Sequence, residues 1–406
     1  MYILLAIPFF FLLMGLEMLV GYLKKKKWYR FNDAVTNLNI GIGQQAFSLL
    51  SKALLLGAYI YIQEHWAFFY IAPAVWSFFA CLILFDFFFY WAHRWSHEIN
   101  FFWGAHVVHH SSEEYNLSVA LRQSWFHNII AFVIFLPIPF LGFDPKVFFA
   151  AAAVQTLYQF WIHTKAIHQF PKWMEYIFNT PSHHRVHHGI NPKYIDKNHA
   201  GMFIIWDRMF GTFQAEEEEP TYGITTQLKS WNPAWANFHY YMEMWQSAKR
   251  MSSWKDKLRV IFARPGWLPD ELGGPLPIPE VKADYKPFDT AVHKGLNWYV
   301  AMQFIIITVG LIAFMANFEH ISTFYRIVFM GLLLLSGMIC GAIFENKRWV
   351  IVAEYARLAL AALSLNTFYY YQYLDWFSIM LVASIGALLL FIPWFTISWR
   401  RWLPTV

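Results

Sequence analysis

The chain has 406 residues, of which 58% are hydrophobic, 21% aromatic and only 14% charged. Because soluble proteins carry roughly 25% charged residues, this composition excludes a soluble enzyme and a disordered chain, and it favours an integral membrane protein. The net charge of +5 does not indicate a nucleic-acid partner, because the basic residues gather in short clusters beside apolar runs.

Nine apolar runs are long enough, or nearly long enough, to cross a bilayer, because a helix of about 20 residues at ~1.5 Å per residue spans its ~30 Å core. In chain order they are Met1 to Leu23, Leu38 to Ile62, Ala67 to Tyr90, Trp125 to Phe143, Lys146 to Trp161, Asn297 to Phe318, Ile327 to Phe344, Trp349 to Leu365 and Trp376 to Trp399. The first run lacks the basic leading segment and the cleavage site of a signal peptide, so we expect it to remain as a membrane helix. Cys81 and Cys340 lie inside two of the runs and are expected to be unpaired core thiols.

Basic residues beside the runs predict the orientation of the chain in the membrane. Lys24 to Arg30, Lys347-Arg348 and Arg400-Arg401 fall on one side if nine spans alternate, and loops rich in lysine and arginine face the cytosol. We therefore expect the N-terminus outside and the C-terminus in the cytosol.

The stretch between the fifth and sixth runs is too polar to span a membrane, and it includes the acidic residues Glu216 to Glu219. We expect four regions along the chain. These are N-terminal membrane helices in residues 1–65, a core in 66–215, a cytosolic segment and linker in 216–295, and a four-helix membrane region in 296–406.

Three short clusters contain nine of the seventeen histidines. They read His93-x3-His97, His106-x2-His109-His110 and His183-His184-x2-His187-His188. Histidines three or four residues apart share one face of a helix, so that two imidazoles can reach one metal ion. In the predicted topology all three clusters, together with His163 and His168 after the fifth run, lie on the cytosolic side.

Clustered imidazoles repel one another if they are protonated, whereas bound metal ions hold them neutral. Eight such ligands exceed what one ion can bind, so we expect two ions. Imidazole suits iron, zinc and copper alike, and the lack of cysteine and carboxylate in the clusters argues against iron–sulfur clusters and structural zinc. The sequence thus predicts an all-α polytopic membrane bundle of about nine spans with a cytosolic, histidine-rich cap that binds two metal ions.

Four ordered segments carry a resemblance to a known superfamily. They are DFFFYWAHRWSH at 86–97, GAHVVHH at 104–110, PSHHRVHH at 181–188 and WDRMFGTF at 206–213. The pattern resembles the fatty acid hydroxylase and sterol desaturase superfamily of membrane-bound, oxygen-dependent di-iron enzymes. The segments YNLSVALRQS at 115–124, QFWIHTKAIH at 159–168 and DKNH at 196–199 are similar to the alkylglycerol monooxygenase family within it.

The resemblance implies a lipid monooxygenase that cleaves the O-alkyl bond of glycerol ether lipids to a fatty aldehyde and a glycerol derivative. It implies two iron ions, with tetrahydrobiopterin as the reductant. The iron ligands that it implies are His93, His97, His106, His109, His110, His184, His187 and His188, with His163 and His168 as additions. Because residues five apart lie about 140° apart on a helix, both additions can bind only if the helix ends between them, and His168 is favoured as nearer the third cluster.

Two carboxylates near the histidines have two interpretations each. Glu98 resembles an acidic residue that contributes to catalysis or to the pterin pocket, or it pairs with Arg94 at the surface. Asp86 either hydrogen-bonds the far nitrogen of a ligand histidine or caps a buried polar patch. A departure from close relatives is His199-Ala200, where tyrosine and glycine are expected, and which adds an imidazole near the metal ions.

The expected partners are a membrane lipid, dioxygen and an external reductant, because no Gly-rich dinucleotide fingerprint is present. The oligomeric state is open. One alternative function is a fatty acid, sterol, carotenoid or sphingoid hydroxylase or desaturase that uses a protein electron donor. Another is a metal or proton transporter, in which intramembrane charges such as Glu354 and Arg357 mark the ion path, although their i,i+3 spacing more simply predicts an ion pair.

Overall fold

The computed structural model describes residues 2–282 and 284–402, and the regular structure in these residues is helical apart from two isolated β-bridges. Seven of the described helices are long and apolar enough to cross a membrane. They are α1 (Tyr2–Leu23), α2 (Phe31–Trp66), α3 (Val75–Glu98), α13 (Lys294–Asn317), α14 (Thr323–Phe344), α15 (Val350–Gln372) and α16 (Leu374–Trp402). The prediction of an all-α polytopic membrane bundle is confirmed.

Shorter helices fill the polar stretches and the remaining apolar runs. They are α4 (Asn100–His110), α5 (His127–Phe135), α6 (Pro137–Leu141), α7 (Pro145–Trp161), α8 (Lys172–Ile177), α9 (Pro181–His187), α10 (Ile205–Met209), α11 (Pro233–Arg250) and α12 (Trp254–Phe262). Single 3-10 turns occur at Val119–Leu121, Pro192–Tyr194, Asp270–Leu272 and Phe318–His320.

The count of long spans is seven, and the difference from about nine lies in the fourth and fifth apolar runs. The fourth run is divided into α5 and α6 at Pro137, which has no N–H for the helix ladder. The fifth run forms α7, which has 17 residues. Between them Gly142 adopts φ +92°, and its carbonyl accepts a 3.0 Å hydrogen bond from the Ile71 N–H. The two runs therefore form a hairpin whose tip packs against the loop between α2 and α3.

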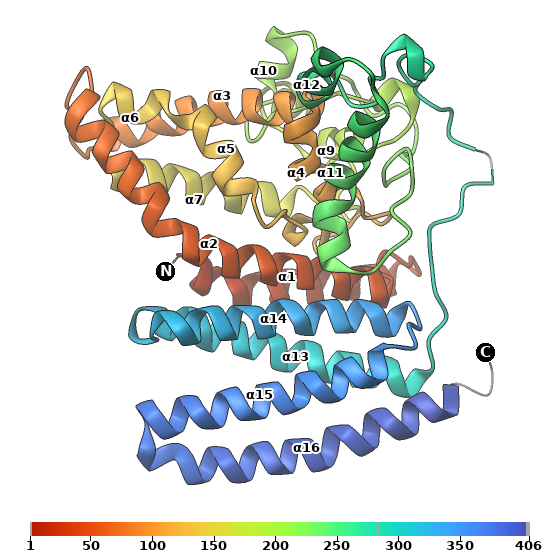
Figure 1. The fold of residues 1–406 in the computed structure, drawn as a ribbon. Coiled ribbons are helices and arrows are strands. Elements are labelled where there is room, and N and C mark those ends of the chain that lie inside the picture. The colour runs from red at the N-terminus through yellow and green to blue at the C-terminus, as the bar shows by residue number, and fades with distance from the viewer. Residues whose placement is uncertain (1, 283, 403–406) are drawn as a thin grey trace.

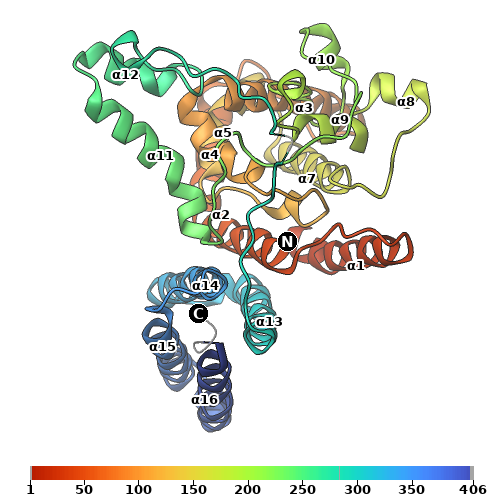
Figure 2. The same cartoon turned by 90° about the vertical axis from the view of Figure 1, so that its right-hand side faces the viewer.

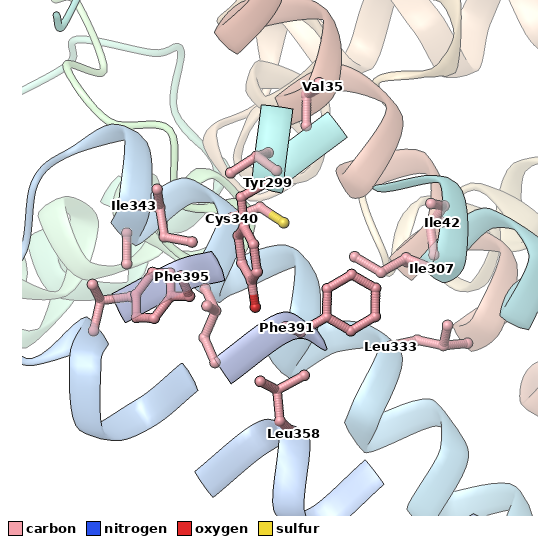
Figure 3. Packing of buried hydrophobic residues seen from close by; sticks show 14 of the residues in the cluster. Val35, Ile42, Tyr299, Ile307, Leu333, Cys340, Ile343, Leu358, Phe391 and Phe395 are labelled. Atoms are coloured by element: carbon pink, nitrogen blue, oxygen red, sulfur yellow. The ribbon is translucent and has the colours of Figure 1, made fainter. Parts of the chain in front are cut away.

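The C-terminal helices form a layer of their own. Helices α13 to α16 lie side by side below α1 and α2 in Figure 1, and Figure 2 shows the same four helices end on. Contacts of α2 with α13 and α14 join this layer to the rest of the protein. Apolar side chains such as Tyr299, Cys340, Leu358, Phe391 and Phe395 pack at its centre, as Figure 3 shows.

A buried ion pair lies inside this C-terminal layer. Arg357 donates to both carboxylate oxygens of Glu354, at 2.6 and 2.7 Å, so the pair expected from their spacing forms. Arg357 also donates to Gln303 at 2.7 Å and to Ser336 at 3.2 Å, and the Tyr299 hydroxyl donates to Glu354. Because these groups come from α13, α14 and α15, the network ties three helices together.

The Arg357→Leu variant should lose about 3–5 kcal/mol of stability, because the buried Glu354 carboxylate is left without a counter-charge. The double variant Glu354→Gln/Arg357→Leu should recover most of that loss, since no unpaired charge remains. The free energy of unfolding of the detergent-solubilised protein checks both. Equal destabilisation of the single and double variants would contradict this account of the pair.

Candidate metal centre

The histidines come together because several helices end at the same place. Helix α3 carries His93 and His97 in its last two turns, and the single extended residue Ile99 separates α3 from α4. The sharp corner at Ile99 directs the histidines of α4 back toward those of α3. Helix α9 and the turn after α7 supply the remaining histidines from the opposite side.

Eight of the nine clustered histidines, all except His183, form two groups together with His163, and in each group one ring nitrogen per residue lies within 4.8 Å of the others. Group 1 contains His93, His97, His106, His110 and His187, and group 2 contains His109, His163, His184 and His188. All nine side chains are buried. The His110 and His188 rings stack 4.3 Å apart, so the two groups are direct neighbours.

In group 1 the Nε2 atoms point toward one another. The Nε2–Nε2 distances are 2.9 Å for His93 and His106, 3.0 Å for His106 and His110, and 3.1 Å for His110 and His187. The buried Nε2 of His97 has no hydrogen-bond partner. Two nitrogens bound ~2.1 Å from one metal ion at right angles lie about 3.0 Å apart, so these separations fit ligands that share an ion.

In group 2, which has four histidines, Nε2 atoms also lie close to one another. The Nε2 atom of His163 lies 3.2 Å from that of His109 and 3.0 Å from that of His184. The buried Nε2 of His188 has no hydrogen-bond partner. Four imidazoles can bind one ion and leave coordination positions for other molecules.

The outer nitrogens of group 1 are held by one short loop, residues 196–199. The Nδ1 atom of His93 lies 2.7 Å from the carbonyl oxygen of His199, and that of His187 lies 2.9 Å from the carbonyl oxygen of Lys197. The Nδ1 atom of His97 lies 3.4 Å from the Asp196 carboxylate. A carbonyl oxygen only accepts, so Nδ1 of His93 and of His187 carries the proton and the Nε2 lone pair faces inward.

Group 2 is held from a different part of the chain. The Nδ1 atom of His109 lies 3.1 Å from the Arg122 carbonyl oxygen, and that of His163 lies 2.7 Å from the Gln159 carbonyl oxygen. The Arg122 guanidinium donates to the Val108 carbonyl oxygen at 2.6 Å and so fixes the end of α4. No role for Arg122 was expected from the sequence, although it lies in the segment YNLSVALRQS at 115–124 that is similar to relatives.

The loop 196–199 is itself built around buried polar side chains. The Asp207 carboxylate accepts hydrogen bonds from the backbone N–H of His199 at 2.7 Å and of Ala200 at 2.8 Å. Asn198 and Asp196 adopt left-handed φ values of 55°. The Asn198 side chain donates to the carbonyl oxygens of His183, at 3.0 Å, and Gln214, at 2.7 Å. Burial raises the pKa of Asp207 to about 6.

Asp86 caps a buried polar patch, and its hydrogen bonds go to residues other than the ligand histidines. Its carboxylate accepts from the Gln155 side chain and the Met202 N–H, both at 2.6 Å, from the Phe203 N–H at 3.0 Å and from the Trp206 indole at 2.9 Å. Asp86 precedes His93 by seven residues, or about 10 Å along the helix axis. The Asp86 carboxylate can therefore contact residues 202–206 at a level of the helix that lies away from the histidines.

Glu98 lies outside both groups and forms the surface pair. Its carboxylate accepts from Arg94 at 3.1 Å and lies 3.6 Å from Arg264. The assignment of Glu98 to catalysis or to a pterin pocket stays a prediction.

The structure reverses the order in which His163 and His168 were ranked. Helix α7 ends at Trp161, so His163 lies in the turn directly after it and enters group 2. His168 lies outside both groups, five residues further along, where its carbonyl oxygen accepts from Arg185 at 2.6 Å. His199 is fully buried, and its ring centre lies 5.0 Å from that of His97 without joining group 1.

The electrostatics of the site favour the neutral form of eight of its imidazoles. Burial, and then the charge of neighbouring imidazoles, lowers the pKa of His106, His110 and His184 well below the usual value. Neutral rings with inward lone pairs are what metal binding requires. The residues present therefore fit two metal ions, one in each group.

Comparison with known proteins identifies relatives of the chain. The family model for fatty acid hydroxylase matches residues 78–212. The chain is 40% identical to alkylglycerol monooxygenase from Homo sapiens over 305 residues, which cover 74% of this chain and 68% of the relative. It is 35% identical to alkylglycerol monooxygenase from Xenopus tropicalis over 361 residues, 87% of this chain and 80% of the relative. No solved structure matches.

The pair of variants His163→Ala and His168→Ala separates the two additional histidines. The first should remove a ligand of group 2 and lower the bound metal from about two ions per chain toward about one, whereas the second should leave it unchanged. Metal analysis of the purified protein after dialysis against a chelator checks this. Loss of metal from His168→Ala with retention in His163→Ala would contradict the geometry.

Asp207→Ala should weaken metal binding in group 1 selectively, because the loop that orients His93 and His187 loses its anchor. Loss of an outer hydrogen-bond partner typically lowers metal affinity by roughly 10–100-fold. Chelator titration should then show one weakened and one unchanged site, with Asp256→Asn on α12 as the control. Equal weakening of both sites would show that the loop supports the cap as a whole.

Proposed function

This chain belongs to the alkylglycerol monooxygenase family of fatty acid hydroxylases, and we propose that it inserts oxygen into the alkyl chain of a glycerol ether lipid. The single observation that carries the proposal is the pair of buried, all-imidazole groups, which lie next to the end of the long apolar helix α3. Two iron ions bound there, with dioxygen and a reductant, supply the chemistry that hydroxylates an unactivated C–H bond.

The protein's own residues hold, orient and shield the metal groups in this proposal. The nine histidines of groups 1 and 2 present Nε2 lone pairs, and the carbonyl oxygens of Lys197, His199, Arg122 and Gln159 keep four of the rings in the required tautomer. The Phe89 ring centre lies 5.4 Å from that of His93, and the Trp103 ring centre lies 5.0 Å from that of His97. These aromatic rings exclude water from group 1 and offer an apolar surface to an alkyl chain.

The position of hydroxylation decides the products. Hydroxylation of the carbon next to the ether oxygen consumes one dioxygen, two electrons and two protons, and it releases one water. The resulting hemiacetal loses its C–O bond to the glycerol oxygen and gives a fatty aldehyde and a free glycerol hydroxyl. Because a hemiacetal collapses by itself, the protein needs no separate hydrolytic residue. Tetrahydrobiopterin is the reductant proposed to deliver the two electrons.

The order of the helices supports an active site on the cytosolic face. Helix α3 ends with histidines on the same side as Lys24 to Arg30, Lys347-Arg348 and Arg400-Arg401. The hairpin of α5, α6 and α7 begins and ends on this side of the membrane. Every other loop therefore lies on the same side of the membrane whether the hairpin is counted as two spans, which makes nine, or as none, which makes seven. Basic loops face the cytosol, which places the N-terminus outside and the C-terminus inside.

Aldehyde release from an alkylglycerol by iron-loaded membranes tests the proposal. Aldehyde should form with tetrahydrobiopterin, should be absent without it, and should be absent from the His184→Ala variant, which loses a group 2 ligand. The His168→Ala variant, with its histidine outside both groups, serves as the matched control and should remain active.

Two other outcomes would redirect the assignment. In the first, the iron-containing protein yields no aldehyde with pterin but hydroxylates a fatty acyl, sterol, carotenoid or sphingoid chain when a reduced electron-transfer protein is supplied. That result would replace the ether lipid by one of these chains as the substrate. A folded, iron-free protein that oxidises no lipid would remove the oxygenase function altogether.

A further inference from the structure

Helices α11 and α12 expose apolar side chains although neither belongs to the seven long spans. On α11 the exposed side chains are Trp235, Phe238, Met242 and Trp245, each between 42% and 57% exposed. Their spacing of three, four and three residues puts them on one face of the helix. The buried residues Pro233, Ala236 and Asn237 lie on the other side of the helix.

Helix α12 continues the pattern. Trp254, Leu258 and Phe262 follow one another at intervals of four residues and are 65%, 48% and 69% exposed. Val260, on the opposite face, is buried. Two successive helices therefore each bury one side in the protein and present an uncovered apolar stripe on the other. We call the seven exposed side chains of the two helices the apolar stripe.

Helix α11 runs across the direction of the long helices α13 to α16 rather than along it (Figures 1 and 2). Figure 1 shows it crossing the direction of α13 to α16, and Figure 2, in which those four helices are seen end on, shows α11 lengthwise. Its beginning is fixed at the end of α14, where Glu345 accepts from the Ser230 hydroxyl at 2.6 Å and from the Trp231 N–H at 2.7 Å. The apolar stripe thus begins at the level where a long span leaves the bilayer.

The charge beside the α12 part of the apolar stripe is positive. Residues 249–264 contain six lysines and arginines against one acidic residue, Asp256. Lys255, Lys257 and Arg259 flank the exposed side chains of α12, and Arg259 and Arg264 line a surface hollow at its end. An apolar stripe bordered by basic residues is the pattern by which helices bind the surface of an anionic membrane.

We propose that α11 and α12 form a membrane-surface element of this protein. Their apolar stripe inserts between the headgroups of the cytosolic leaflet, and the basic residues of 249–264 bind the phosphates of anionic lipids. The continuity with α14 and the positive charge favour a lipid surface over a second copy of the chain, which would bring two sets of like charges together. The inference does not depend on which lipid the metal centre oxidises.

Site-directed spin labelling of the full chain in vesicles tests this. Labels are placed at Leu258→Cys and Phe262→Cys in the stripe and at the matched control Lys257→Cys, while Cys81 and Cys340 are buried. In vesicles that contain anionic phosphatidylserine, the water-soluble relaxing agent NiEDDA should reach labels 258 and 262 at least about threefold less than label 257, and oxygen should reach them more. The double variant Lys255→Gln/Arg259→Gln, which leaves position 257 available for the control label, should reduce this protection.

Each other outcome overturns the proposal. Equal access of NiEDDA to labels 257, 258 and 262 would show that the stripe faces water. If labels 258 and 262 are protected from NiEDDA but also show dipolar broadening between two chains, the stripe would instead be an interface between copies of the protein. Equal protection in phosphatidylserine and in purely zwitterionic vesicles would remove the role of the basic residues.

Discussion

The structure depends on burying nine imidazoles in one place. A buried imidazole with an unpaired N–H loses hydration without compensation, and a protonated one is repelled by its neighbours. Carbonyl oxygens accept from the outer nitrogens of four of the rings, His93, His109, His163 and His187, and the inner nitrogens turn toward one another. The outer nitrogens of His106 and His184 are buried without a partner. The helix ends at Glu98, His110, Trp161 and His187 and the loop 196–199 are arranged to satisfy this requirement.

The sequence predicted those parts of the metal centre that depend only on residues close together in the chain. Histidines three or four residues apart on α3, α4 and α9 were identified from spacing, because a helix brings such residues to one face whatever the rest of the fold does. The ranking of His163 below His168 was wrong because it rested on distance along the chain, whereas the end of α7 decides which histidine enters the site. Arg122 and Asp207 lie in the quoted segments YNLSVALRQS and WDRMFGTF, but they act through backbone groups, so their roles follow only from the fold.

The membrane fold was predictable from composition, and its details were not. Runs of apolar residues predicted the long helices, since length and hydropathy alone decide whether a helix can span. Pro137 and Gly142 changed two runs into a hairpin of shorter helices, and neither residue changes the average hydropathy. The Glu354–Arg357 pair was predicted from its spacing, but its links to Gln303 and Ser336 depend on how α13, α14 and α15 pack together.

The origin of the ligands along the chain sets an order of assembly during synthesis. Both metal groups draw on α9, so a ribosome that has released only α3, α4 and α7 has produced five to six scattered imidazoles and no finished site. Group 2 has all its histidines once residue 188 has emerged, whereas group 1 also waits for the loop that ends at His199. The long helices α13 to α16 contribute no ligand to either group, so metal loading can precede their insertion into the membrane.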